Sequence, residues 1–212
     1  MIISEVSEFF RLFNSHLGES FLFFSLFWIV HGINQLCGQK LNIFGIIPRH
    51  PASIIFGPIC APFLHADFNH LLYNSFPLFF MLAILFAKGP SQAIATILAM
   101  NLLTGLITWL IARRGNHIGA SGLIMALFGF LLYKGYQSPS VESIIIALII
   151  LYYFGTLLLS IFPDDLLTSY EGHLAGLIAG IVIAHYGIPY SIQTIAIKPA
   201  YYLNIMAATL FR

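Results

Sequence analysis

Long apolar segments separated by short polar ones dominate the pattern of this sequence. A helix that crosses a membrane needs about 20 mostly apolar residues. Six segments meet this requirement: 20–36, 69–87, 91–112, 120–137, 143–162 and 172–188. Glycine, proline and charged residues fill the gaps between them, which is typical of turns. The pattern therefore predicts an all-α polytopic membrane protein, built as a bundle of six transmembrane helices.

Three further segments lie outside the predicted spans. Residues 1–19 carry apolar residues at helical spacing, which predicts a short helix at the membrane interface. The first connection, 37–67, contains four prolines and is too long for a simple turn, so we expect it to have a compact structure of its own. The tail, 189–212, has two prolines and polar interruptions, and we interpret it as interfacial rather than as a seventh span.

Composition supports a lipid environment. Hydrophobic residues make up 59% of the chain and charged residues only 8%, against roughly 25% charged residues in soluble domains. The formal net charge of +1 gives no reason to expect a nucleic-acid partner. Cys37 and Cys60 both fall in the first connection, where one disulfide is an alternative, but two free thiols are the interpretation that we favour.

The positions of the charged residues exclude several functions. All eight acidic residues lie outside the predicted spans or at their ends. Ion-coupled transport and intramembrane aspartyl proteolysis both need acids at membrane depth, so neither is favoured. The chain has no HExxH motif, which argues against a helical zinc hydrolase. The basic residues divide almost evenly between the two sides of the membrane and leave the orientation open.

Ser121 is a candidate nucleophile. It opens the fourth predicted span, in the sequence Gly119-Ala120-Ser121-Gly122. The first N–H groups of a helix have no intrahelical partner, and the helix dipole favours negative charge there. Donors at or beside Ser121 would therefore stabilise the oxyanion formed when its hydroxyl attacks a carbonyl. A serine in a membrane helix more commonly bonds a neighbouring helix, so Ser121 alone is a weak signal.

His173, in the sixth predicted span, is the candidate base. Gly176 and Gly180 follow it on the same helical face. The fourth span carries a matching stripe of small residues beside Ser121: Gly122, Ala126 and Gly129. Two such helices can pack backbone to backbone. This packing would bring the hydroxyl and the imidazole within hydrogen-bond distance, so we predict a dyad without a carboxylate.

His70 and Asn74 lie one turn apart on one face of the second span. Both side chains can donate a hydrogen bond to a developing oxyanion, and neither carries a fixed negative charge. We therefore predict an oxyanion and substrate-binding set of His70, Asn74 and the backbone at Gly119 and Ala120. Interhelical hydrogen bonding by Asn74 is the structural alternative.

Two other histidines lie near these groups. His65 precedes the second span and could shape the rim of a cavity. His117 could also line this cavity, although packing within its own loop is the interpretation that we favour. A metal site would have to use His65, His70 and His173. These residues include no helical HxxxH pair and have no supporting carboxylates. We therefore expect neither a metal nor another cofactor.

Taken together, the motifs resemble those of rhomboid intramembrane serine proteases, over residues 20–188 and in the same order. The matching features are Gly119-Ala120-Ser121-Gly122, His70-xxx-Asn74 and His173 with its glycine seam. The resemblance implies a serine endopeptidase with a Ser121–His173 dyad and an oxyanion hole that includes His70 and Asn74. It also implies a water-filled cavity open to the extracytoplasmic side, a cytoplasmic N-terminus and an extracytoplasmic first loop.

The resemblance implies that transmembrane proteins are the substrates, cleaved near the extracytoplasmic membrane surface. The expected partners are these substrates and membrane lipids. The compact core without large appended domains indicates a prokaryotic inner membrane. Two alternatives stay open: a catalytically inactive rhomboid-like protein that binds membrane helices, and a small transporter of neutral solutes. Met125 stands where many rhomboid proteases have an aromatic residue, which keeps the inactive alternative in view.

Overall fold

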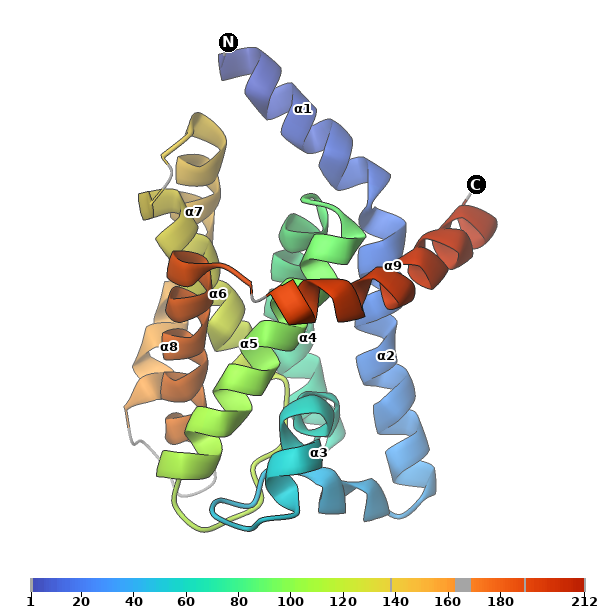
Figure 1. The fold of residues 1–212 in the computed structure, drawn as a ribbon, viewed down its shortest axis with the longest axis vertical. Helices are drawn as coiled ribbons and strands as arrows, with labels where there is room; N and C mark the ends of the chain where they lie inside the picture. Colours follow the sequence, from blue (N-terminus) through green and yellow to red (C-terminus); the bar gives the residue numbers. More distant parts are fainter. Residues whose placement is uncertain (1, 138, 163–168, 189, 212) are drawn as a thin grey trace.

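The computed structural model describes residues 2–137, 139–162, 169–188 and 190–211. Over these residues the chain folds into nine α-helices and three short 3-10 helices (Figure 1). Within the same residues, β-type backbone pairing is confined to one isolated bridge between Ile46 and His117. The predicted all-α fold is confirmed.

The helices of the bundle follow the six predicted apolar segments. They are α2 (Leu17–Leu36), α4 (Phe68–Phe86), α5 (Pro90–Ile111), α6 (Ser121–Gln137), α7 (Val141–Phe154) continued by η3 (Gly155–Ile161), and α8 (Tyr170–Tyr186). The largest difference from prediction is at the start of α2, which begins at Leu17 rather than at residue 20. Hydropathy therefore locates these elements well.

Four of the described helical segments are long and apolar enough to cross a membrane: α2, α4, α5 and α7 with η3. Helices α6 and α8 have 17 residues each. At 1.5 Å per residue they are about 25 Å long, shorter than the roughly 30 Å hydrocarbon core. The six-span count thus stays a prediction for α6 and α8.

Local sequence signals explain where several helices begin. The Asp67 carboxylate caps α4 by accepting the N–H of His70 at 2.9 Å. Ser140 caps α7, and Ser143 returns a hydrogen bond to the Ser140 backbone. Pro90 occupies the first position of α5, where its missing N–H costs nothing. At the starts of α4 and α7, a polar side chain therefore accepts an N–H group that has no acceptor within its own helix.

Helices α6 and α8 are the most closely packed pair of the bundle. A Cβ atom on Gly176 would overlap the carbonyl oxygen of Gly122, and one on Gly180 would overlap that of Ala126. Backbone therefore packs on backbone along this seam, which confirms the predicted contact between the two small-residue stripes.

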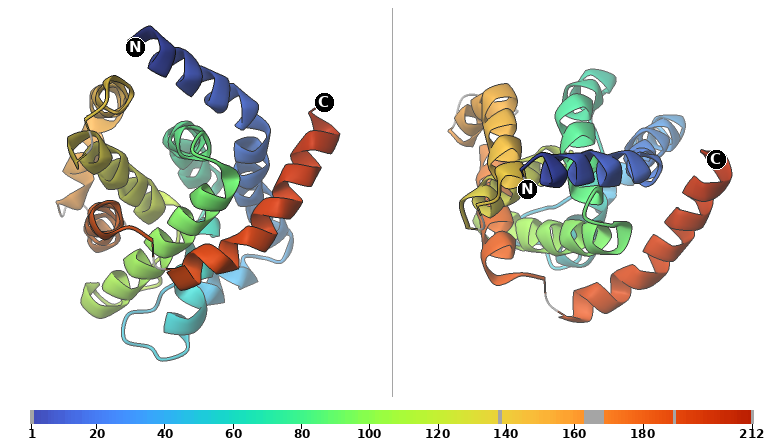
Figure 2. Two further views of the ribbon diagram at one scale, coloured as in Figure 1. Left: turned by 45° about the horizontal axis from the view of Figure 1, so that its top comes forward. Right: turned by 90° about the horizontal axis from the view of Figure 1, so that it is seen from above.

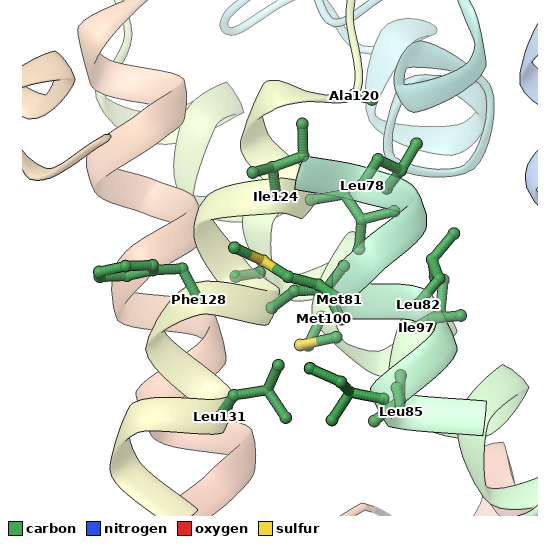
Figure 3. Packing of buried hydrophobic residues seen from close by; sticks show 14 of the residues in the cluster. Leu78, Met81, Leu82, Leu85, Ile97, Met100, Ala120, Ile124, Phe128 and Leu131 are labelled. Carbon is green, nitrogen blue, oxygen red and sulfur yellow. The ribbon is translucent and has the colours of Figure 1, made fainter. Parts of the chain in front are cut away.

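Apolar side chains of α4, α5 and α6 form the core. Figure 3 shows Met81 and Leu85 of α4 against Met100 of α5 and Leu131 of α6, and each of these is buried. Ala120, directly before α6, lies at one end of this cluster. The start of α6 is thus held by the core below it.

The first connection folds over the lower end of the bundle in Figure 1, opposite α1 (Ile2–Ser15). It contains η1 (Lys40–Phe44), α3 (Ser53–Cys60) and η2 (Ala61–Phe63), so its predicted compact structure is confirmed. The Trp109 indole of α5 donates to the His50 carbonyl at 3.0 Å, and the Arg49 N–H donates to the Trp109 carbonyl at 3.2 Å. Cys37 and Cys60 are free thiols, as we favoured.

Two peripheral helices lie outside the bundle. Helix α1 extends from α2 towards α7, and α9 (Tyr190–Leu210) crosses the outside of α5 and reaches α2 (Figures 1 and 2). Ala196, Ala200 and Ala207 form the buried face of α9. The interfacial placement of residues 1–19 and 189–212 stays a prediction.

Candidate active site

Ser121 is the first residue of α6, and a tight turn at Gly119 leads into it. Gly119 has a φ of +120°, in the left-handed region that favours glycine. A Cβ atom at this position would lie 2.8 Å from Cε1 of His70. The glycine therefore lets the His70 ring of α4 lie against the backbone just before Ser121, so two of the predicted site residues meet here.

The amides of Gly119 and Ala120 are already bonded within the protein. The Gly119 N–H donates to the Ala61 carbonyl at 2.9 Å, and the Ala120 N–H donates to Nε2 of His65 at 3.2 Å. In contrast, the Ser121 N–H has no acceptor among the residues that the structure describes. The donor that this turn leaves for a ligand is thus the amide of Ser121, while Gly119 and Ala120 shape the turn.

His65 lies in the interior rather than at the rim where we expected it, and its side chain has no exposed surface. Burial, assisted by the neighbouring His70, lowers the pKa of His65 to about 4. The ring is therefore neutral near pH 7, and its Nε2 keeps the lone pair that accepts the Ala120 N–H. Sequence reasoning missed this role because nothing local to His65 specifies a partner 55 residues away.

Asn74 is buried on α4, one turn beyond His70. Its Nδ2 has no hydrogen-bond partner in the described part of the chain. Leaving a buried donor unpaired costs roughly 1–3 kcal/mol, so such a group calls for an explanation. A donor held ready for an oxygen that forms only during a reaction would be such an explanation.

His173 is buried in the first turn of α8. Its Nδ1 lies 3.0 Å from the carbonyl oxygen of Ser160 in η3. Because a carbonyl can only accept, Nδ1 carries the proton and Nε2 holds the basic lone pair. The role of Ser160 has no sequence signature, since any residue supplies a carbonyl.

Ser121 and His173 lie on helices that touch at Gly122 and Gly176. Among the described residues no hydrogen bond joins the two side chains; the one recorded for the His173 ring goes to Ser160. Catalytic hydrogen bonds are often long without substrate and tighten when it binds. The structure thus places the helices of the predicted pair in contact and leaves the dyad itself a prediction.

A cavity of about 50 Å³ adjoins Ser121, between α5, α6 and the first connection. Its polar lining includes Thr104, Thr108 and His117. His117 also packs within its own loop, as we favoured, because its Nε2 lies 3.0 Å from the Arg113 carbonyl. The hydroxyls of Thr104 and Thr108 are buried without a partner in the described residues. The cavity exceeds the 10–15 Å³ or so that one water molecule needs, and these hydroxyls offer polar partners.

Comparison with known proteins supports the resemblance to rhomboid proteins. Residues 54–190 match the family model of the Rhomboid domain, which includes α4, α6 and α8. An uncharacterized protein of Mycobacterium bovis is 36% identical over 172 residues, which are 77% of this chain and 71% of that protein. An uncharacterized protein of Mycobacterium leprae is 33% identical over 174 residues, 77% of this chain and 68% of its own length. With its long apolar helices, the chain is therefore an integral membrane protein of the rhomboid family.

Proposed function

We propose that this protein is an intramembrane serine endopeptidase that cleaves transmembrane substrates near the extracytoplasmic membrane surface. The observation that carries the proposal is the setting of Ser121, which opens a helix beside a cavity able to hold water and whose amide has no acceptor in the described ranges. The adjoining helix brings His173, whose Nδ1 is already committed to a carbonyl. Membrane proteins place such polar groups in protein interiors or water-filled cavities, and polar groups at these places commonly mark functional sites.

The proposed reaction begins when the Ser121 hydroxyl attacks the scissile carbonyl and Nε2 of His173 takes its proton. His173 then gives this proton to the leaving amine, and an acyl-enzyme forms on Ser121. A water molecule from the cavity attacks the ester with His173 again as base, which releases the second product and restores the serine. The Ser160 carbonyl keeps the Nδ1 proton in place throughout.

Each tetrahedral intermediate carries a negative oxygen that needs donors. The Ser121 amide, the His70 ring and Nδ2 of Asn74 are the donors that we assign to it. The positive end of the α6 dipole adds to their effect. Gly119 and Ala120 contribute by shaping the turn, because their own amides are occupied.

The orientation that fits this reaction has a cytoplasmic N-terminus and an extracytoplasmic first connection. The short α6 and α8 would then begin below the membrane surface, at the floor of the cavity. A substrate helix must unwind locally before its carbonyl is exposed, and a glycine lowers this cost by about 1 kcal/mol relative to alanine. The mycobacterial relatives support a prokaryotic cell membrane as the location.

The decisive experiment compares purified variants on a single-span test substrate and on a fluorophosphonate probe. We expect Ser121→Ala and His173→Ala each to lower the cleavage rate by roughly a thousandfold or more, because the dyad acts as a unit. Only proteins that retain both Ser121 and His173 should become labelled by the probe. Ser25→Ala is the matched control, since the Ser25 hydroxyl donates to the Leu22 carbonyl of its own helix, 2.8 Å away. Undiminished cleavage by either dyad variant would refute the assignment.

A protein that binds the substrate helix without cleaving it would leave both the substrate and the probe unchanged. That result would favour the inactive, helix-binding alternative over the protease.

A further inference from the structure

A chain of hydrogen bonds joins the loop before Ser121 to the start of α8. In this loop, Nε2 of His117 lies 3.0 Å from the Arg113 carbonyl. Its other nitrogen, Nδ1, lies 2.6 Å from Oγ of Ser169. Ser169 is the N-cap of α8, and its Oγ accepts the N–H of Gly172 at 3.2 Å. This series of hydrogen bonds ends at Gly172, one residue before His173.

The donor and the acceptor in each of these bonds can be assigned. The Arg113 carbonyl can only accept, so Nε2 of His117 carries the proton and Nδ1 is the acceptor in the neutral ring. The Ser169 hydroxyl therefore donates to Nδ1, while its oxygen receives the Gly172 N–H. Each hydrogen atom has one partner, so the network specifies a single arrangement of the two segments.

A second link joins the same two segments. The backbone N–H of Arg113 donates to Oε1 of Glu171 at 3.2 Å, and Nε of the Arg113 side chain lies 3.5 Å from the same oxygen. Glu171 is buried, where an ionic hydrogen bond is stronger than at a water-exposed surface. The loop is also fixed on its far side, because the backbones of His117 and Ile46 exchange two hydrogen bonds of 2.9 and 3.0 Å.

These bonds complement the glycine seam between α6 and α8. The seam sets how close the two helices lie, because carbonyl oxygens occupy the space of the missing side chains at Gly176 and Gly180. Contacts between small residues are weakly directional, whereas hydrogen bonds fix direction and distance. Hydrogen bonds at the cavity end are therefore suited to fix the axial position of α8 relative to α6. The same bonds would fix the axial position of His173 relative to Ser121.

We propose that His117 and Ser169 form a positioning clamp that sets His173 in register with Ser121. The clamp rests on the proposed function, since it serves the Ser121–His173 dyad. Neither residue takes part in bond cleavage, and both act through the placement of α8. Both line the same cavity as Ser121, so the clamp borders the site directly.

The test measures cleavage and fluorophosphonate labelling for His117→Asn, whose shorter side chain cannot bridge the Arg113 carbonyl and the Ser169 hydroxyl, and which leaves the Ser169 cap in place. We expect kcat and the labelling rate to fall by roughly ten- to a hundredfold with KM unchanged, because small displacements of a catalytic group are this costly. Ser169→Ala should slow both rates, and Ser169→Thr, which keeps the hydroxyl, should restore them.

His185→Asn is the matched control. His185 bonds the Tyr133 hydroxyl at 2.7 Å and so joins the same two helices at their other end. We expect this variant to keep kcat within about twofold, since a lost exposed hydrogen bond costs little. Equal losses in the His117 and His185 variants would reduce the effect to general helix packing and overturn the clamp, as would full activity of His117→Asn.

Hydrogen exchange separates this proposal from the protease assignment. If the parent protein neither cleaves nor reacts with the probe, the proposed function fails, but the clamp still predicts an effect on α8. Amides in the first turn of α8 should then exchange faster in His117→Asn than in the parent or in His185→Asn. Unchanged exchange in the His117 variant overturns the clamp whatever the activity.

Discussion

A backbone carbonyl at Ser160 gives His173 what a carboxylate gives the histidine of a catalytic triad. It accepts the Nδ1 proton at 3.0 Å and so selects the tautomer with a basic Nε2. His65 is used in a comparable way, as a neutral acceptor for the Ala120 amide. At the scale of single residues, hydrogen bonds thus organise the site, and within the described part of the chain they leave the Ser121 amide and Nδ2 of Asn74 without a partner.

The unpaired amide group of Asn74 leads to a prediction about activity and stability together. Asn74→Ala should lower kcat by roughly a hundredfold, as loss of one oxyanion donor does. It should not lower the melting temperature, because the NH₂ group that it removes is buried and has no hydrogen-bond partner among the residues described. Cleavage assays and thermal unfolding in detergent measure the two effects.

Asn34→Ala is the contrasting variant. The buried Asn34 side chain donates to Oδ1 of Asn42 at 2.8 Å and accepts the Leu41 N–H at 3.0 Å. Its loss should destabilise the fold by about 1–3 kcal/mol, since it leaves partners unsatisfied. If Asn74→Ala instead melts like Asn34→Ala and keeps its turnover, Asn74 is a structural residue.

At the scale of elements, α6 and α8 differ from α7 in what surrounds them. Small residues let α6 and α8 approach to backbone contact in the interior of the bundle. The segment of α7 and η3 is mostly exposed, with only 17% of its most apolar stretch buried, so it lies at the edge of the bundle. An ion pair of 2.6 Å between Lys88 and Glu142 holds the beginning of α7. At the other end of this segment, η3 carries the Ser160 carbonyl that accepts a hydrogen bond from His173.

We predict that Gly176→Ala is destabilising although alanine is the better helix former. The added methyl group would overlap the Gly122 carbonyl, and relieving such overpacking typically costs about 1–3 kcal/mol. The matched substitution is Gly32→Ala on α2, where a Cβ meets nothing within 4 Å. Thermal unfolding should show a lower melting temperature for Gly176→Ala only, together with reduced cleavage. Equal melting temperatures would mean that the seam tolerates a wider spacing.

At the scale of the whole molecule, the candidate site and the first connection occupy one end of the bundle and α1 the other (Figure 1). This polarity lets the orientation be tested directly. Cys37 follows α2 at the end where the first connection begins, and it is an exposed free thiol.

In intact cells that express the Cys60→Ser variant, a membrane-impermeant maleimide should modify Cys37. The proposed orientation puts the end of α2 outside the cytoplasm, and the exposed thiol is accessible there. Mass spectrometry of the purified protein measures the modification, and Cys37→Ser with Cys60→Ser controls for other targets. Labelling of Cys37 that appears only after the cells are opened would reverse the orientation.

Much of this arrangement follows from the sequence by itself. An apolar segment has to become a helix in lipid, because an unpaired backbone group there costs several kcal/mol. The helix bounds therefore follow from hydropathy, and the glycine spacing of α8 correctly indicated the face that meets α6. The candidates Ser121, His173, His70 and Asn74 were also visible, since their residue types and helical spacing are local properties.

Only the tertiary structure decided which groups these residues contact. The partners of Ala120, His173 and Ser169 come from segments 55, 13 and 52 positions away, and two of the acceptors are histidine nitrogens with no local signature. The same is true of the occupied amides at Gly119 and Ala120. Hydrophobic periodicity depends on neighbours along the chain. Hydrogen-bond partners depend on which helices meet and on how these helices are shifted along their axes, and this relative placement is settled only when the whole bundle packs.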